Sequence, residues 1–167
     1  MRKLRWGLLS TARINRAVIP PIRGSVRSKL SAVASRDLSK AQAYAAEWHI
    51  PQAYGAYEEL LADENIDAIY NSLPNHLHAE WSIRAAEAGK HVLCEKPLAL
   101  SVEEVDRITA AARNHGVVIA EAFMYKHHPQ TLKVLELIGQ GVIGDVLLIK
   151  GAFTFKLDRP DDVRWAP

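Results

Sequence analysis

The residues Glu95-Lys96-Pro97 place an acid and a base directly after the short apolar stretch 90–94, which is typical of a buried β-strand. Ligands of open α/β sheets bind beyond the carboxyl ends of the strands, so a strand that ends on Glu-Lys delivers two charged groups to that place. Pro97 fixes its own φ and therefore the direction in which the chain leaves the sheet. Lys96 is the candidate for proton transfer. The alternative is a solvated surface pair.

The first strand-to-helix turn carries small residues where a dinucleotide approaches the backbone. Backbone N–H groups at the start of a helix bind a pyrophosphate, and small side chains let it come close. Two glycines of the usual fingerprint are replaced here, yet the turn joins the first strand to the first helix, where such a site is expected. We predict cofactor contacts from Gly7, Ser10, Thr11, Ala12, Arg13 and Ile14.

The end of the second strand carries Ser35-Arg36, with Asp37 one residue later. NAD-preferring proteins usually place an acid there to bind the ribose 2′-hydroxyl. A hydroxyl and a guanidinium suit a 2′-phosphate instead, because a carboxylate would repel it. We therefore predict NADP rather than NAD. In the alternative, Arg36 is solvated, Asp37 binds the ribose, and NAD is the cofactor.

Apolar residues alternate between strand-like and helix-like spacing along the chain. Strands are predicted at Leu4–Leu9, 29–36, Gln52–Tyr54, 66–73, 90–94 and 117–123. Helices are predicted between them, with one buried stripe of Ile14, Ala17, Val18 and Pro21 and another of Val102, Val105, Ile108 and Ala112. This alternation predicts an α/β fold, a doubly wound parallel Rossmann sheet with helices on both faces.

Local signals mark the ends of several predicted helices. Asp37 or Ser39 and the Ser101/Glu104 pair have the residue types and spacing of helix N-caps. Gly89 closes another helix at a position that favours positive φ.

Residues 146–157 alternate apolar and polar side chains, which predicts a strand with one covered face. No later segment in the sequence would cover that face. We therefore expect the first strand of a truncated α+β domain over residues 145–167, after a dinucleotide-binding domain over 1–144. The chain would be a fragment, or it would borrow a partner chain at this strand.

The composition describes a globular chain of 167 residues with a formal charge of only +2 and one cysteine. Interspersed charges argue against a nucleic-acid partner. No apolar run reaches the length of a membrane span, and the basic N-terminus lacks the apolar core of a signal peptide. A lone cysteine fits a reducing cytoplasm.

Four motifs resemble the glucose-fructose oxidoreductase / inositol dehydrogenase family, namely residues 6–14, Leu73-Pro74-Asn75 with His78, Glu95-Lys96-Pro97, and residues 121–125. The resemblance runs in order over about 155 residues. Within the family it is most similar to sugar and dihydrodiol dehydrogenases. It implies that Lys96 contacts the substrate hydroxyl, that Glu95 lies near the nicotinamide ribose, and that Leu73 and Asn75 line the cofactor cleft. His78 would support that turn, Pro97 would complete the motif, and Glu121 would border the cleft.

The chemistry agrees with these residue types. Oxidation of a carbinol requires a hydride to leave the carbon and a proton to leave the oxygen. Lys96 would accept this proton, with its pKa lowered by burial and by the cationic nicotinamide. Glu95 acts in the opposite sense. We expect an NADP-preferring oxidoreductase acting on a sugar, polyol or diol, incomplete in this chain, and a homo-oligomer through its second domain when complete. The alternative is a non-catalytic dinucleotide-binding module that acts through a partner.

For the remaining histidines and the cysteine we predict neither metal binding nor catalysis. The adjacent or alternate spacing of His76, His78, His127 and His128 does not chelate a metal, and no metal is expected. Cys94 precedes the Glu-Lys-Pro motif on a buried strand and is expected to be a small core residue.

Overall fold

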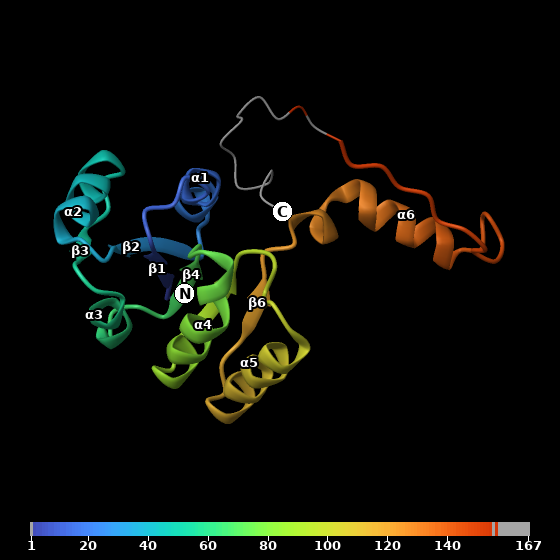
Figure 1. Ribbon diagram of the computed structural model, residues 1–167. Coiled ribbons are helices and arrows are strands. Elements are labelled where there is room, and N and C mark those ends of the chain that lie inside the picture. The colour runs from blue at the N-terminus through green and yellow to red at the C-terminus, as the bar shows by residue number, and fades with distance from the viewer. Residues whose placement is uncertain (1, 155, 157–167) are drawn as a thin grey trace. The chain divides into compact units, whose positions relative to one another are not determined.

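The computed structural model describes residues 2–154 and 156, and its contacts divide the chain into one unit that ends at Phe123 and a second from Met124. The first unit contains a six-stranded sheet in the order β3-β2-β1-β4-β5-β6, and every neighbouring pair is parallel. The strands are β1 (Leu4–Leu9), β2 (Ser28–Ala34), β3 (Gln52–Tyr54), β4 (Ala68–Asn71), β5 (His91–Cys94) and β6 (Ile119–Glu121). This order confirms the predicted Rossmann sheet, with its switch point between β1 and β4 (Figure 1).

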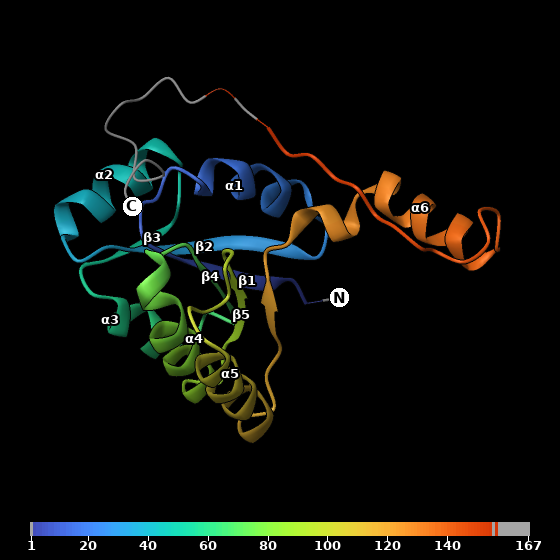
Figure 2. The ribbon, with the colours of Figure 1, turned by 45° about the vertical axis from the view of Figure 1, so that its right-hand side comes forward.

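Helices cover both faces of the sheet. They are α1 (Asn15–Gly24), α2 (Leu38–Glu47), α3 (Tyr57–Ala62), α4 (His78–Glu87) and α5 (Val102–Asn114), with a short 3₁₀ turn, η1 (Asn75–Leu77), before α4. Figure 2 shows α1 and α2 on one face and α3, α4 and α5 on the other. Successive strand residues point to opposite faces, so Leu8 packs with α1 and α2 while Leu9 packs with α3 and α4. Both leucines are fully buried.

The predicted capping signals are confirmed at three helix ends. The Asp37 carboxylate accepts hydrogen bonds from the first-turn N–H groups of α2, and Ser101 accepts one from Glu104 N at 3.2 Å at the start of α5. Gly89 follows α4 with φ +72°. These ends are fixed locally, which is why residue type and spacing were sufficient to predict them.

The predicted buried stripe of α1 is wrong. The helix buries Asn15, Ile19 and Ile22, whereas Ile14 is 39% exposed. Periodicity favoured an apolar face, but the helix begins at Asn15, whose amide is hydrogen-bonded to Ser10 O and Ser72 Oγ inside the fold. In α5 the prediction is confirmed only for Ile108, which is buried. Val102 is 72% exposed, and the other buried residue is Ala111 instead of Ala112.

The second unit contains η2 (Met124–His127) and α6 (Pro129–Gly139). The Nδ1 atom of His128 accepts a hydrogen bond from Gln130 N at 3.2 Å and caps α6. Within the described part of residues 146–157, namely 146–154 and 156, no strand forms, so the predicted strand is wrong there. A strand needs a neighbouring strand for its N–H and C=O groups, and no strand among the described residues pairs with this segment. Residues 155 and 157–167 lie outside the described residues, and the division at residue 144 stays a prediction.

None of the described helices is long and apolar enough to cross a membrane.

Candidate functional site

A cleft of about 730 Å³ lies at the carboxyl ends of β1, β2 and β4. Its lining comes from the turns after these strands, with one residue each from the first turns of α2 and α3. The lining residues are Ser10, Thr11, Ala12, Ser35, Arg36, Asp37, Lys40, Tyr57, Ser72, Leu73 and Pro74. The sheet order reverses between β1 and β4, which is where doubly wound folds bind their ligands.

The turn from β1 to α1 presents unpaired backbone donors. The Ser10 Oγ atom accepts from Ala12 N at 3.1 Å, and Ser10 has φ +93°, a conformation that usually favours glycine. Among the described residues, none accepts a hydrogen bond from the N–H of Thr11, Arg13 or Ile14. Ile14 also provides no side-chain cap to α1. The turn therefore fits a pyrophosphate, because these N–H groups need an acceptor from outside the chain.

Asn15 holds this turn, and sequence reasoning missed it. The side chain is fully buried; its Nδ2 donates to Ser10 O at 2.8 Å, and its Oδ1 accepts from Ser72 Oγ at 2.7 Å. The amide thus joins the turn after β1 to the turn after β4. A polar residue inside a helix pattern is the signal that could have pointed to it, since a buried amide must be hydrogen-bonded.

The residues after β2 were predicted either to bind a 2′-phosphate through Ser35 and Arg36 or to bind the ribose through Asp37. Asp37 Oδ1 accepts from Ser39 N at 2.9 Å and from Ser39 Oγ at 2.6 Å, and the Ser39 hydroxyl is the main cause of the lowered pKa of the Asp37 carboxyl. This carboxylate is occupied as a helix cap. Ser35 is buried and Arg36 exposed at the cleft. Burial raises the pKa of Tyr57, and the guanidinium of Arg36 beside it acts in the opposite sense.

Lys40 and Tyr57 line the cleft but were not predicted. Lys40 adds a second cation next to Arg36, and its ammonium lies 3.8 Å from Asp37 Oδ2. Its position in the first turn of α2 could have predicted this role, because that turn lies directly after the carboxyl end of β2. Tyr57 begins α3 and offers a buried aromatic ring at the cleft. Only the fold brings this helix beside the end of β2.

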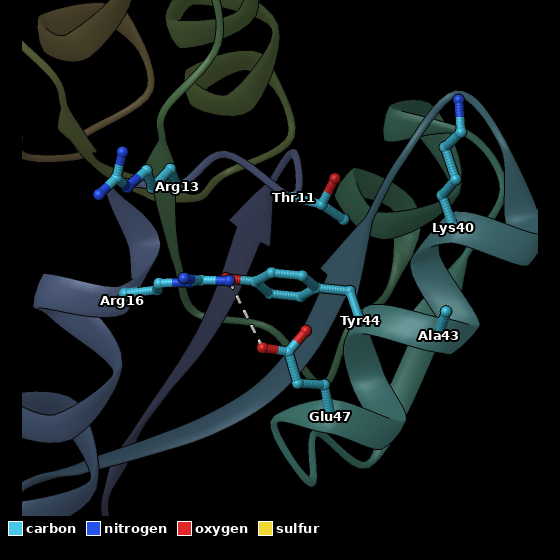
Figure 3. Close-up of a pocket in the computed structure, with 7 residues that line it drawn as sticks. All are labelled: Thr11, Arg13, Arg16, Lys40, Ala43, Tyr44 and Glu47. Atoms are coloured by element: carbon cyan, nitrogen blue, oxygen red, sulfur yellow. Dashed lines mark ion pairs between the residues drawn. The ribbon is translucent and has the colours of Figure 1, made fainter. Parts of the chain in front are cut away.

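A second groove of about 440 Å³ adjoins the cleft and shares Thr11 and Lys40 with it. Figure 3 shows its walls from α1 and α2, with the Arg16 guanidinium beside the ring of Tyr44 and paired with Glu47 at 3.6 Å. Arg13 also lines this groove. The predicted cofactor residue Arg13 therefore lines this groove and is not among the residues that line the cleft.

The Glu-Lys-Pro loop follows β5, as predicted, and its acid is bound to the protein. The buried hydroxyl of Tyr70 donates to Glu95 Oε1, and the backbone N–H of Lys96 donates to Glu95 Oε2 at 3.3 Å. Burial is the main cause that raises the pKa of the Tyr70 hydroxyl, and the hydrogen bond to the Glu95 carboxylate raises it further. Glu121 Oε1 accepts from Leu98 N at 3.0 Å, so Glu121 also holds this loop. Lys96 itself is exposed.

His78 joins the two loops that the resemblance singled out. Its ring nitrogens lie 2.7 Å from the carbonyl oxygens of Pro97 and of Leu73, and its side chain is fully buried. Leu73 is 5% exposed and lines the cleft, whereas Asn75 lies exposed in η1. His78 is therefore placed as a support for both loops.

Gly7 is not brought to the cleft. It lies within β1, and a Cβ on it would come 2.8 Å from Leu60 Cδ2 and 3.3 Å from Ile66 Cγ2. Its small size therefore serves the packing of α3 on the sheet. Burial raises the pKa of the Cys94 thiol to about 12, which agrees with a core residue. Among residues 2–154 and 156, no three His, Cys, Asp or Glu side chains form a metal-binding group.

Residues 4–123 match the family described as "Oxidoreductase family, NAD-binding Rossmann fold", which is the glucose-fructose oxidoreductase / inositol dehydrogenase family. The chain belongs to this family. A family relative, an uncharacterized oxidoreductase of Rhizobium meliloti, is 48% identical over 155 residues, which are 92% of this chain and 46% of the relative. A D-xylose 1-dehydrogenase (NADP(+)) of Haloferax volcanii is 45% identical over 164 residues, which are 97% of this chain and 50% of that protein.

A solved structure with the same fold is a 3-ketoreductase from Actinomadura kijaniata in complex with NADP and TDP-benzene. It is 36% identical with a TM-score of 0.79, and the match covers 86% of this chain and 44% of that one. The chain therefore spans about half the length of the curated relatives it matches. The family assignment rests on the part of the chain that forms the sheet and its cleft.

Proposed function

We propose that this chain is the nucleotide-binding part of an NADP-preferring oxidoreductase that transfers a hydride between the nicotinamide and a carbinol of a sugar, polyol or diol. The observation that carries the proposal is the cleft at the switch point of the sheet, which brings cations after β2 together with N–H groups after β1 that have no acceptor among the described residues. The Lys96 loop follows β5 at the same edge of the parallel sheet. The relatives named above include an NADP-linked xylose dehydrogenase and an NADP-bound ketoreductase.

The preference for NADP is supported by the charges at the end of β2. Ser35, Arg36 and Lys40 offer a hydroxyl and two cations. The Asp37 carboxylate accepts hydrogen bonds from the first-turn N–H groups of α2 and caps that helix. A free carboxylate would select the ribose 2′-hydroxyl, whereas this arrangement suits a 2′-phosphate. The turn over residues 10–12 would hold the pyrophosphate.

Lys96 is proposed as the proton donor or acceptor. When bound, NADP supplies or accepts the hydride. Lys96 extends from the loop that Tyr70, Glu95 and Glu121 fix to the sheet, so its backbone is held while its ammonium reaches outward. In a complete version of the enzyme, Lys96→Ala should abolish turnover and leave cofactor affinity unchanged. Turnover that survived the change would show that another group moves the proton.

A second candidate is a non-catalytic dinucleotide-binding module that acts through a partner. It is favoured by the large apolar side chains of the second unit that are more than half exposed, namely Met124, Tyr125, Leu132, Leu135, Val142, Ile143, Leu147, Leu148, Ile149 and Phe153. In the oxidoreductase, the second domain would cover such residues and would join the copies of a homo-oligomer. We also propose the cytoplasm as the place of action.

The test is a titration of the chain with NADPH and with NADH, followed by energy transfer from tryptophan to the reduced nicotinamide. We expect NADPH to bind at least about tenfold more tightly, since a charge-assisted contact contributes about 1.5–3 kcal/mol. Arg36→Ala should remove this preference, and the exposed Arg27→Ala, on the loop before β2, should keep it. Equal binding of the two nucleotides would refute the NADP assignment, and binding of neither would refute the site.

A further inference from the structure

The groove between α1 and α2 contains a buried hydroxyl that lacks a partner. Tyr44 is 9% exposed, and its Oη atom makes no hydrogen bond within the described residues. A buried polar group without a partner is rare in native proteins. Burial raises the pKa of this phenol, so it keeps its proton at neutral pH and needs an acceptor. The neighbouring amide of Asn15 is hydrogen-bonded to Ser10 O and Ser72 Oγ instead.

The groove around this hydroxyl is lined by cations. Figure 3 shows Arg13, Arg16 and Lys40 along its walls, with the Arg16 guanidinium beside the Tyr44 ring. Guanidinium and ammonium groups donate hydrogen bonds and cannot accept them. Among residues 2–154 and 156, the Arg13 side chain makes no hydrogen bond or ion pair. The missing partner of the hydroxyl is therefore an acceptor from outside the chain, and the cations favour one that carries negative charge.

Two carboxylates stand beside these cations, and neither forms a close pair with them. Glu47 also lines the groove and lies 3.6 Å from Arg16, and Asp37 lies 3.8 Å from Lys40. Both distances are longer than a charge-assisted hydrogen bond, and all four side chains are exposed. Exposed pairs of this kind contribute little free energy. Arg16 can therefore turn from Glu47 toward a better acceptor, which opens the way to the Tyr44 hydroxyl.

We propose that this groove binds a phosphate ion, at a site separate from the phosphates of the cofactor. Phosphate offers several acceptor oxygens at once, which suits a hydroxyl and two guanidinium groups in one groove of about 440 Å³. Under the proposed function, the cofactor phosphates have other partners, namely the N–H groups after β1 and the side chains after β2. Tyr44, Arg13 and Arg16 do not line that cleft.

The groove shares Thr11 and Lys40 with the cofactor cleft, so a phosphate ion in it would act on the cofactor. The ion and a 2′-phosphate in the cleft would both attract the Lys40 ammonium and would repel each other. We therefore expect phosphate to weaken NADPH binding. NADH binding should change much less, because NADH lacks the 2′-phosphate. This consequence rests on the proposed function, whereas phosphate binding itself does not.

The first test uses no cofactor. Phosphate is titrated into the chain at constant pH and ionic strength, with chloride as the balancing ion, and the backbone amide NMR signals of α2 report binding. Tyr44→Phe keeps the ring in the core and removes only the hydroxyl. We expect its phosphate affinity to fall at least about tenfold, the loss typical of a hydrogen bond to a charged group. Arg13→Ala should weaken binding as well, and the matched control Arg107→Ala, an exposed arginine of α5 on the other face of the sheet, should not.

Urea denaturation gives an independent readout. A ligand that binds only the folded chain stabilises it, so phosphate should raise the midpoint of the native chain more than that of Tyr44→Phe. In phosphate-free buffer, Tyr44→Phe should be at least as stable as the native chain, because the change removes a buried polar group that has no partner. A lower midpoint of Tyr44→Phe in that buffer would show that the hydroxyl has a partner inside the fold, and would overturn the inference.

The remaining outcomes separate the phosphate site from the cofactor site. Equal phosphate affinity of the native chain and Tyr44→Phe would place the ion elsewhere, and absence of phosphate binding would refute the site. If Tyr44→Phe weakens NADPH binding in phosphate-free buffer and spares NADH binding, the groove holds the 2′-phosphate of the cofactor, and the separate site is wrong. A chain that binds phosphate through Tyr44 but binds no dinucleotide would refute the proposed function and support the groove.

Discussion

Replacing Asn15 by alanine tests whether the cofactor turn is built by one buried amide. Asn15 Nδ2 donates to Ser10 O at 2.8 Å, and Asn15 Oδ1 accepts from Ser72 Oγ at 2.7 Å. Alanine at this first residue of α1 removes both hydrogen bonds. The Ser72 hydroxyl retains Leu9 O as an acceptor at 3.1 Å, whereas no other side chain in the described part of the chain donates to the Ser10 carbonyl.

The expected cost follows from these contacts. An unsatisfied buried carbonyl costs about 1–3 kcal/mol, and the partly buried Ser10 carbonyl falls in the lower half of that range. The second lost hydrogen bond contributes about 1 kcal/mol. The higher helix propensity of alanine returns about 0.5 kcal/mol. We therefore expect the free energy of unfolding to fall by about 2 kcal/mol. NADPH affinity should fall by about tenfold, because a turn that is no longer preorganised must be ordered on binding.

Urea denaturation followed by tryptophan fluorescence measures this change. The midpoint should drop by about 1 M with an unchanged slope, since the slope reports the surface exposed on unfolding. The matched control is Asn114→Ala at the exposed end of α5, which should stay within about 0.5 kcal/mol of the native chain. A change of less than about 0.5 kcal/mol for Asn15→Ala would refute the assignment of this amide as the support of the turn.

Two further substitutions test the packing and the electrostatics of the sheet. Gly7→Ala should lower the free energy of unfolding by about 1–3 kcal/mol, because its Cβ would come 2.8 Å from Leu60 Cδ2. NADPH affinity should stay unchanged. A loss of affinity at full stability would place Gly7 at the cofactor instead. Lys90 donates to two backbone carbonyls at 2.8 Å, and burial lowers its pKa, so the unfolded chain binds more protons between the folded and unfolded pKa values. Urea midpoints should accordingly show the stability advantage of the native chain over Lys90→Met increasing with pH through this window, and a constant difference would contradict the reasoning.

The elements of the fold were predictable because their signals are local or periodic. Six strands with helices between them follow from apolar spacing, and Asp37, Ser101 and Gly89 mark helix ends within a few residues. The stripe of α1 was not predictable in this way, since Asn15 is polar and its burial depends on Ser10 and Ser72, the latter 57 residues away. The predicted strand within 146–157 failed at its described residues, because pairing partners are not a property of the segment itself.

The candidate site divides in the same manner. The Glu-Lys-Pro motif and the Ser-Arg pair after β2 were found from residue types at strand ends, and the fold places both at the carboxyl edge of the sheet. Their partners were not found: Tyr70 binds Glu95, and Lys40 stands beside Arg36. Asp37 Oδ1 caps α2, as the sequence allowed, and the part of Asp37 in ribose binding stays a prediction.

The sequence by itself determined the parallel Rossmann sheet, the order of its elements and the two motifs at the cofactor edge, because these depend on the period of apolar residues and on what each residue type can do. Only the tertiary structure decided that Asn15 holds the turn after β1, that His78 also contacts the loop after β5, and that Gly7 serves packing. These roles depend on distances between strands that are far apart in the chain. Hydrogen bonds form only within about 3 Å, and a linear sequence does not contain such distances.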